Sequence, residues 1–354
     1  MKYIQLMDCT MRDGGWVNEF SFGTEGMRDI LQTVEDAGVE FVELGYLDQV
    51  KGFFHEGSMY KNLSALSESF SGVERREGTT RLVMIDYGKF DVEKLSKLGQ
   101  DEDRVIDGIR LCFHKKDTKE ALELGKKILD RGYKLFVQPM VASRYFDDDV
   151  KALIEDAEKT VPGFSAIYVV DSFGVMDVKN IVERLLLMDE LLDPGIMLGL
   201  HTHNNLNLCI EHAKAAVELT RGTCSAVQVE RGLHRDRRLI IDATLQGLGK
   251  GAGNLVIEDI ASYLNENEGK NYAVDKLKEL SGRRIEPMRD LYSWGYGPEY
   301  EMSSRYFVTP TYARVFFQEC SKSLQELETF LSSIPENKKD SFDRKYVEEY
   351  LRKM

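Results

Sequence analysis

Three residues at the ends of apolar segments have the chemistry of a metal site. Asp13 follows the first apolar run, within DCTMRDGG (8–15), and His201 and His203 close a later run, within GLHTHNN (199–205). Side chains two positions apart on a strand share a face, so both imidazoles can point at one centre. One carboxylate and two imidazoles are ligands that divalent cations accept. Their placement at strand ends favours a metal site over two unrelated histidines.

Two further charged residues suit a reaction in which negative charge develops on an oxygen. Arg12 adjoins Asp13, and its guanidinium keeps its proton, so it can stabilise an enolate without taking part in proton transfer. Glu43 lies in the otherwise apolar segment FVELG (41–45). Because a buried charge needs a partner, we expect Glu43 to pair with Arg12. The alternative for Arg12 is a salt bridge that only anchors its loop.

Two loops could complete such a site. DSFG (171–174) ends another apolar run, and GKGAGN (249–254) lies near the end of the same region. Glycines let backbone amides approach a substrate closely and could bind a carboxylate or phosphate at a helix start. Asn254 is either an outer metal ligand or a helix cap.

Short apolar runs that alternate with amphipathic segments must position these residues. Most are nearly continuous, which is typical of strands buried on both faces of a parallel sheet. Eight such strands with short connections predict an α/β fold, a closed (β/α)8 barrel over residues 1–265, with its active site at the carboxyl ends of the strands. The predicted strands are 3–8, 39–45, 81–86, 108–113, 134–139, 166–171, 196–201 and 225–230.

The last part of the chain has a different character. Residues 266–354 are charged and helix-prone, without the strand rhythm, and their Tyr and Trp residues cluster at 292–312. They predict a C-terminal helical extension that packs on the barrel.

Composition narrows the class of protein. Of the 354 residues, 42% are hydrophobic and 30% charged, as in ordinary globular proteins. The net charge of −13 disfavours nucleic acid and anionic membranes as partners. Five scattered cysteines without a CxxC, and no leader or long apolar span, predict a cytoplasmic protein.

The motifs, taken in order, resemble the DRE-TIM metallolyases. That superfamily includes 4-hydroxy-2-oxovalerate aldolase, 3-hydroxy-3-methylglutaryl-CoA lyase, and the isopropylmalate, citramalate and homocitrate synthases. The matching features are RDGG (12–15), the inward Glu43, HTHNN (201–205) and GKGAGN (249–254), and GYGPEY (295–300) is similar to the aldolase branch. The resemblance implies a TIM barrel and a divalent cation, Mn²⁺ or Mg²⁺. It implies as metal ligands Asp13, His201 and His203, with Asn254 as a fourth.

The resemblance also implies roles for other residues and for partners. Arg12 would stabilise the enolate, Glu43 would orient Arg12 or join proton transfer, and Tyr300 would lie near the substrate. The expected substrate is a small 2-oxo acid or aldehyde, and the expected assembly is a homodimer. The extension lacks a long match to the aldolase segment that docks a dehydrogenase, so we do not assume that partner.

One position departs from the aldolase pattern. Pyruvate-releasing aldolases have a histidine base three residues after the metal aspartate, and here that position is Trp16. Indole has only an N–H donor and cannot accept a proton. The candidates for a relocated base are Glu43, Tyr300, His114 and a metal-bound hydroxide. Trp16 could instead stack on a bulkier substrate.

Three functions follow from these patterns. The leading hypothesis is metal-dependent cleavage or formation of a carbon–carbon bond in a 4-hydroxy-2-oxo acid, through a pyruvate-type enolate. The second is a Claisen-type condensation of an acyl-CoA with a 2-oxo acid, although those synthases usually have RDGEQ where this chain has RDGGW. The third, suggested by Trp16, is a catalytically altered metal-binding module.

Overall fold

Eight parallel strands form a closed barrel. The computed structural model describes residues 3–51, 56–100, 105–320 and 323–353. Around the barrel the order is β1-β9-β8-β7-β6-β5-β4-β2, and β1 also pairs with β2, which closes the ring. The predicted (β/α)8 barrel is therefore confirmed. The barrel strands are β1 (Ile4–Asp8), β2 (Phe41–Leu47), β4 (Thr80–Asp86), β5 (Gly108–Phe113), β6 (Lys134–Pro139), β7 (Ala166–Asp171), β8 (Met197–Thr202) and β9 (Leu239–Ala243), and a short strand, β3 (Met59–Tyr60), pairs with β2.

The eighth barrel strand does not lie at the predicted position. Residues 225–230 contain a 3-10 turn, Ser225–Val227, and most of their side chains are exposed. The strand that closes the barrel is β9, which pairs with β1 on one side and β8 on the other. The segment SAVQVE alternates apolar and polar residues, as a one-faced strand would. Every residue of β9 is buried, as a strand covered on both faces requires.

The inside of the barrel has an apolar part and a polar part. The apolar part includes Phe41, Phe136 and Tyr168, and Gly199 makes room for the tyrosine, because a Cβ there would lie 2.3 Å from its ring. The polar part lies nearer the carboxyl ends of the strands and contains fully or almost fully buried charged and amide side chains, namely Glu43, Arg110, Gln138 and Asp242. The polar part leads towards the predicted metal ligands.

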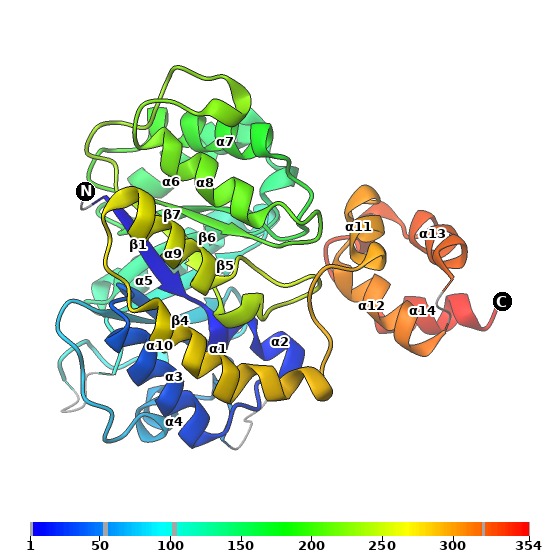
Figure 1. Ribbon diagram of the computed structural model, residues 1–354, viewed down its shortest axis with the longest axis horizontal. Helices are drawn as coiled ribbons and strands as arrows, with labels where there is room; N and C mark the ends of the chain where they lie inside the picture. The colour runs from blue at the N-terminus through cyan, green and yellow to red at the C-terminus, as the bar shows by residue number, and fades with distance from the viewer. Residues whose placement is uncertain (1–2, 52–55, 101–104, 321–322, 354) are drawn as a thin grey trace.

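Helices cover the outside of the barrel (Figure 1). Helix α5 is representative, since Ala121, Leu122, Gly125 and Ile128 form one buried face at helical spacing. Between β4 and β5, the described residues form only a 3-10 turn, Val92–Lys94, at the place of a helix. The larger helices are α3 (Thr24–Asp36), α4 (Leu63–Ser69), α5 (Thr118–Asp130), α6 (Asp147–Thr160), α7 (Val178–Leu191), α8 (Cys209–Leu219), α9 (Ile257–Glu268) and α10 (Val274–Leu280), and two short ones, α1 (Thr10–Asp13) and α2 (Gly15–Asn18), follow β1.

The C-terminal helices form a lobe beside the barrel (Figure 1). The lobe consists of α11 (Pro298–Arg305), α12 (Pro310–Glu319), α13 (Leu324–Ser332) and α14 (Arg344–Leu351), and it has its own core around Tyr312, Phe316 and Phe330. Helix α10, by contrast, packs on α3 of the barrel. The boundary between residues 265 and 266 stays a prediction.

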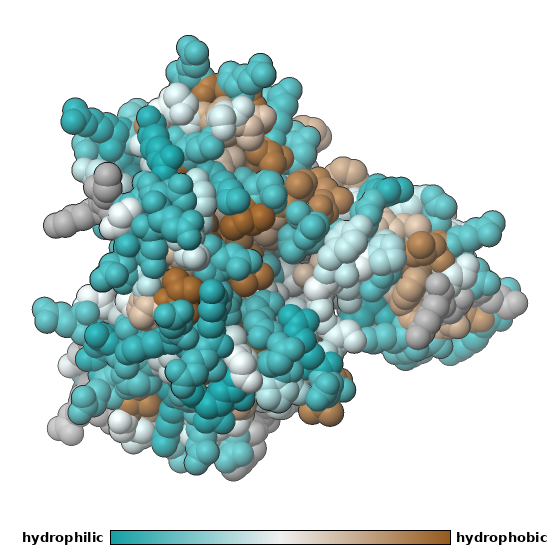
Figure 2. Space-filling model, in the orientation of Figure 1, coloured by the Kyte–Doolittle hydropathy of each residue, from teal (hydrophilic) through white to brown (hydrophobic). Residues whose placement is uncertain are grey.

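The lobe is tied to the loops at the carboxyl ends of the strands. Ser304 donates a hydrogen bond to the carbonyl oxygen of Phe173 (3.0 Å), and Arg144 pairs with Glu336 (2.5 Å). Figure 2 shows that hydrophilic residues dominate this face of both parts. In the described part of the chain, no helix has the length and apolar character needed to cross a membrane.

Candidate metal centre and the cavity above it

Three predicted ligands converge at the carboxyl ends of β1 and β8. The Nε2 atoms of His201 and His203 lie 3.8 and 3.7 Å from Oδ2 of Asp13. Asp13 is in α1, directly after β1, and His201 and His203 lie at and just after the end of β8. All three side chains are buried, and their ligand atoms lie within 4.8 Å of one another. The spacing of the two histidines and the closure of the barrel together produce this cluster.

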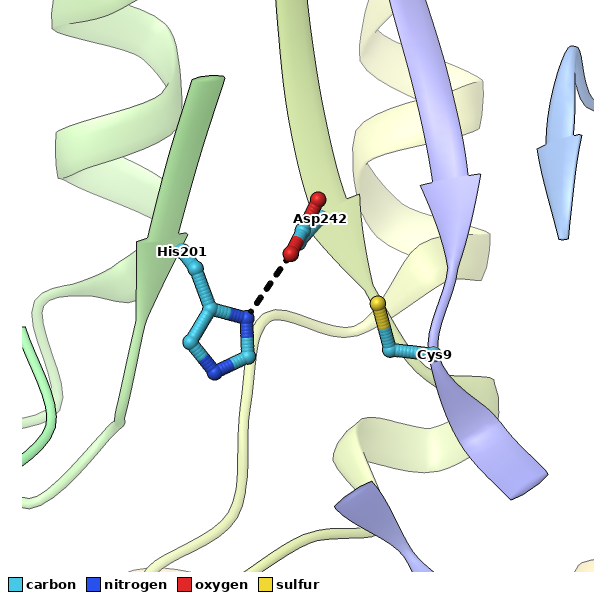
Figure 3. A group of neighbouring side chains, drawn as sticks. All are labelled: Cys9, His201 and Asp242. Carbon is cyan, nitrogen blue, oxygen red and sulfur yellow. Dashed lines mark hydrogen bonds and ion pairs between the residues drawn. The ribbon is translucent and has the colours of Figure 1, made fainter. Parts of the chain in front are cut away.

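Each of the two imidazoles is oriented by an oxygen atom that lies next to its Nδ1. Nδ1 of His203 lies 3.2 Å from the carbonyl oxygen of Lys250, which can only accept, so Nδ1 carries the proton and Nε2 has its lone pair available. Nδ1 of His201 lies 3.0 Å from Oδ2 of Asp242, on the neighbouring strand β9 (Figure 3). Burial lowers the pKa of His203 to about 4, so the ring is neutral at pH 7. Oxygen acceptors on the outer nitrogens of histidine ligands are typical of metal sites.

Two buried oxygen atoms at the cluster are unsatisfied. Oδ2 of Asp13 and Oδ1 of Asn254 have no hydrogen-bond partner among the described residues. The Asn254 amide nitrogen lies 3.5 Å from Nε2 of His201, so the asparagine borders the same centre. A Cβ at Gly249 would lie 1.9 Å from the Asn254 oxygen and 3.0 Å from Oδ2 of Asp13. Glycine at position 249 thus keeps a space next to two oxygen and two nitrogen donors, a set that fits a divalent cation.

A chain of buried ion pairs joins the two sides of the cluster. Arg12 donates from Nε to Oε2 of Glu43 (2.6 Å) and from Nη1 to Oδ1 of Asp13 (2.9 Å). The expected pairing of Glu43 with Arg12 is therefore present. Arg110 donates to the same Glu43 oxygen (2.9 Å) and to Oδ2 of Asp242 (2.6 Å), and Asp242 in turn contacts His201. This series of interactions starts at Asp13 and ends at His201, so both of its ends contact the ligand cluster.

The ion pairs between Asp13 and Asp242 carry a net negative charge that a cation could neutralise. Three carboxylates (Asp13, Glu43 and Asp242) face two guanidinium groups (Arg12 and Arg110), which leaves one formal negative charge. Burial raises the pKa of Asp13, but Arg12 and His203 lower it further, and the result lies below the ordinary value. The carboxylate is therefore ionised at neutral pH. A buried, uncompensated negative charge is costly, and a divalent cation would neutralise it.

A second group of possible ligands, Cys9, His201 and Asp242, is drawn in Figure 3. Burial, followed by the charges of Asp242 and Glu43, raises the pKa of the Cys9 thiol well above its ordinary value. Metals bind the thiolate, and the Asp242 carboxylate already accepts from Arg110. This group therefore supports His201 and does not compete with the cluster at Asp13.

A cavity of about 540 Å³ lies above the cluster, between the barrel loops and the C-terminal lobe. Gly249 and Lys250 belong to its wall, so the floor of the cavity touches the ligand cluster. Tyr300 reaches the cavity from α11, and burial raises its pKa to about 12. His114, at the end of β5, also lines it, and burial lowers the pKa of its imidazole.

Trp16 forms part of the same wall. Its indole N–H lies 3.4 Å from the Tyr46 hydroxyl, and its ring meets Phe20 and Tyr46 edge to face. Nζ of Lys51 lies 3.7 Å from the centre of the ring. The indole is held from several sides and offers the cavity an aromatic surface, which agrees with a stacking role and excludes a role as base.

Several residues at this site could not be identified from the sequence pattern. Asp86, at the end of β4, lines the cavity, and its buried Oδ1 has no hydrogen-bond partner in the described part of the chain. Burial raises the pKa of Asp86 to about 6, although Arg12 opposes the shift. Arg110 was signalled only by its presence in an apolar predicted strand, as Glu43 was, and Asp242 lies in β9, a strand that was not predicted. Arg314 of α12 carries no local signal.

Comparison with known proteins gives one family and several relatives. The family described as HMGL-like matches residues 97–282, just over half of the chain. The 4-hydroxy-2-oxovalerate aldolase of Geobacillus genomosp. 3 is 26% identical over 294 residues, which are 81% of this chain and 78% of that protein. The oxaloacetate decarboxylase of Mycobacterium tuberculosis is 23% identical over 297 residues, covering 83% and 79%.

Solved structures share the fold. The N-terminal domain of a Bacteroides vulgatus protein is 20% identical with a TM-score of 0.70, and the match covers 91% of this chain and 99% of that one. The HMG-CoA lyase of Bacillus subtilis is 14% identical with a TM-score of 0.61, over 82% and 95%.

Proposed function

Since the chain belongs to the HMGL-like family, we propose that it is a divalent-metal-dependent aldolase acting on a 4-hydroxy-2-oxo acid. It would cleave the C3–C4 bond to give pyruvate and an aldehyde, or form that bond in reverse. The family and the relatives named as aldolases make the chain an enzyme of the aldolase and lyase class. The substrate and the metal are the parts of this statement that belong to the proposal.

The observation that carries the proposal is the orientation of the two imidazoles. Both turn Nε2 towards Oδ2 of Asp13 while an oxygen atom holds Nδ1. Asp13, His201, His203 and Asn254 would hold Mn²⁺ or Mg²⁺. When bound, the cation would act as a Lewis acid on the 2-oxo group of the substrate.

Arg12 is proposed to stabilise the enolate. Its Nη2 is buried and has no hydrogen-bond partner among the residues described, whereas Nε and Nη1 are fixed by Glu43 and Asp13. An oriented donor that is not yet used can meet charge as it develops on the C2 oxygen, with little reorganisation. Glu43 would act through Arg12, because its Oε2 accepts from two guanidinium groups and, although its Oε1 has no partner among the described residues, its side chain does not line the cavity.

Proton transfer requires another group, because Trp16 cannot accept a proton. Asp86 is the side chain we propose as the base that takes the C4 hydroxyl proton. It lines the cavity, has an unused oxygen, and with a pKa of about 6 is mostly ionised at neutral pH. The C3–C4 electron pair would remain on the pyruvate fragment as the enolate, which is then protonated at C3. Tyr300, protonated at neutral pH, would donate a hydrogen bond to the substrate.

The first experiment measures metal. Gently purified protein is analysed for bound elements beside the His201→Ala/His203→Ala variant and a His234→Ala control, whose imidazole is more than half exposed and pairs with Asp189. We expect one divalent cation per chain in the wild type and in the control, and none in the double variant. Absence of metal from the wild type after incubation with Mn²⁺ or Mg²⁺ would contradict the proposal.

The second experiment measures reaction. The metal-loaded enzyme is mixed with 4-hydroxy-2-oxo acids that differ beyond C4, and pyruvate is detected with lactate dehydrogenase. We expect pyruvate and the matching aldehyde in equal amounts, with no release after chelation. Thiol release from acetyl-CoA in the presence of a 2-oxo acid, without pyruvate release, would favour the Claisen reaction in its place.

A further inference from the structure

Four basic residues from separate segments line the cavity above the cluster. Lys51 follows β2, Lys89 follows β4, Lys250 lies in the glycine-rich loop, and Arg314 belongs to α12 of the lobe. In the part of the chain that the structure describes, none of the four has a carboxylate oxygen within 4.0 Å. The chain has 60 acidic residues, so this lack of partners at one cavity is not explained by a shortage of carboxylates.

The basic residues are close enough to repel one another. Lys250 lies within electrostatic range of Arg314 and Lys51, and also of Asp13. Burial and the charge of Lys89 lower the pKa of the Lys51 amine, whereas the charges of Asp48 and Asp86 raise it. Charges with this mutual effect lie within the range at which electrostatic interactions are not screened by salt. A bound anion would relieve this repulsion among the four basic residues.

The acidic residues that line the cavity do not balance the positive charge of the four basic residues. Asp340 is exposed, and it already pairs with Arg144 (3.3 Å). Asp86 is mostly ionised at neutral pH, since its pKa is about 6, but it and Asp340 together supply two negative charges against the four positive ones. The cavity therefore keeps an excess of positive charge at neutral pH.

A single substrate carboxylate is too small to pair with all four basic residues. The C1 carboxylate of a 2-oxo acid lies beside the 2-oxo group, and so would lie at the metal-ligand end of the cavity, near Lys250. Lys51, Arg314 and Trp16 also line an adjoining cavity of about 470 Å³. Together the two cavities have room for a substrate that is longer than the adduct of pyruvate with a short aldehyde.

We infer that the substrate carries a second anionic group, a carboxylate or a phosphate, at the end remote from its 2-oxo group, and that Lys51, Lys89 and Arg314 bind it. This inference rests on the proposed function and specifies its substrate class. On cleavage, the pyruvate fragment stays beside Arg12, and the aldehyde product carries the second anion. Because Arg314 comes from α12, the C-terminal lobe takes part in substrate selection.

Binding of two matched 2-oxo acids tests the inference without turnover. 2-Oxoglutarate and 2-oxopentanoate have the same five-carbon chain and differ in a terminal carboxylate or methyl group. We expect isothermal titration calorimetry on the metal-loaded enzyme to give at least a tenfold tighter Kd for 2-oxoglutarate, since a charge-assisted hydrogen bond contributes about that much. Titration with 2-oxo-4-phosphonobutanoate compares a terminal phosphonate with the terminal carboxylate of 2-oxoglutarate. Equal affinity for the acid and its methyl analogue would overturn the inference.

Substitutions test which residues cause the difference in affinity between the two acids. Arg314→Gln is expected to weaken 2-oxoglutarate about tenfold or more and to leave 2-oxopentanoate unchanged, and Lys89→Met should do the same if the first variant folds poorly. Arg305→Gln is the matched control, because Arg305 is exposed on the same lobe and, among the residues that the structure describes, pairs only with Glu301. A loss for both acids, or the same loss in the control, would overturn the assignment of these residues.

The outcome separates the inference from the proposed function. Cleavage of an acid with an uncharged tail as fast as one with an anionic tail would refute the second-anion subsite and leave the aldolase proposal standing. Failure to cleave any 4-hydroxy-2-oxo acid would refute both.

Discussion

Replacing Asp242 by asparagine tests whether the buried ion-pair chain supports the metal ligands. The carboxylate holds Nδ1 of His201 (3.0 Å) and accepts from Arg110 (2.6 Å), whereas an amide oxygen is uncharged and cannot serve both equally well. Loss of such a partner behind a histidine ligand typically weakens metal binding about 10- to 100-fold. Breaking a buried pair costs about 3–5 kcal/mol. We expect a loss of about 3 kcal/mol here, because Arg110 retains Glu43 and Gln138.

The assay uses two measurements on each variant. Mn²⁺ affinity is measured by competition with a fluorescent chelator, and the free energy of unfolding of the metal-free protein is measured by urea denaturation. Glu35→Gln is the matched control, because Glu35 and Arg81 form a similarly buried pair (2.6 Å) remote from the cluster, at the start of β4. The control should lose comparable stability and keep its metal affinity. Wild-type affinity in Asp242→Asn, or equal loss of affinity in the control, would refute the reasoning.

Three further predictions concern residues at the cluster and in the cavity. Arg12→Lys should retain the metal and lower kcat at least tenfold, because lysine has no planar fork, and metal analysis beside steady-state kinetics would show this. Asp86→Asn should lower kcat/KM about 100-fold. It should also remove the acidic limb of the pH profile, in which the wild-type rate falls as pH drops through about 6 and the carboxylate gains a proton. Gly249→Ala should abolish metal binding, because its Cβ would meet the Asn254 oxygen at 1.9 Å, whereas Gly26→Ala, with open space around it, should leave Mn²⁺ titrations unchanged.

Most of the fold could be predicted because barrel strands have a local signature. Seven of the eight predicted strands overlap the barrel strands in the structure, since each is a short apolar run buried on both faces. The exception shows the limit of that signature. SAVQVE and LIIDA are both plausible strands by composition, and the choice between them depends on which segment can pair with β1 and β8 at once. The pairing with β1 joins residues 235 positions apart, such as Ile4 and Leu239, and local spacing cannot report it.

The convergence of Asp13, His201 and His203 was predictable for a similar reason. His201 and His203 share a face by strand geometry, and Asp13 follows the first strand, so each residue could be placed from its own neighbours in sequence. Their supporting partners could not be placed in this way. Asp242 lay outside every predicted strand, and Asp86 gained its perturbed pKa from burial against β2 and β5, which no local pattern records.

Neighbouring residues suffice to predict the barrel, the types of the candidate metal ligands and the strand ends that present them, because side-chain alternation and apolar runs are local properties. The partners of the charges follow only from the folded chain. Closing the ring brings Arg110 to Asp242, which is 132 positions away, and brings Glu43 between two guanidinium groups. It also brings Arg314 of the C-terminal lobe to the cavity of the barrel. Electrostatic interactions depend on distance in space and on burial, and both are set only when the chain is folded.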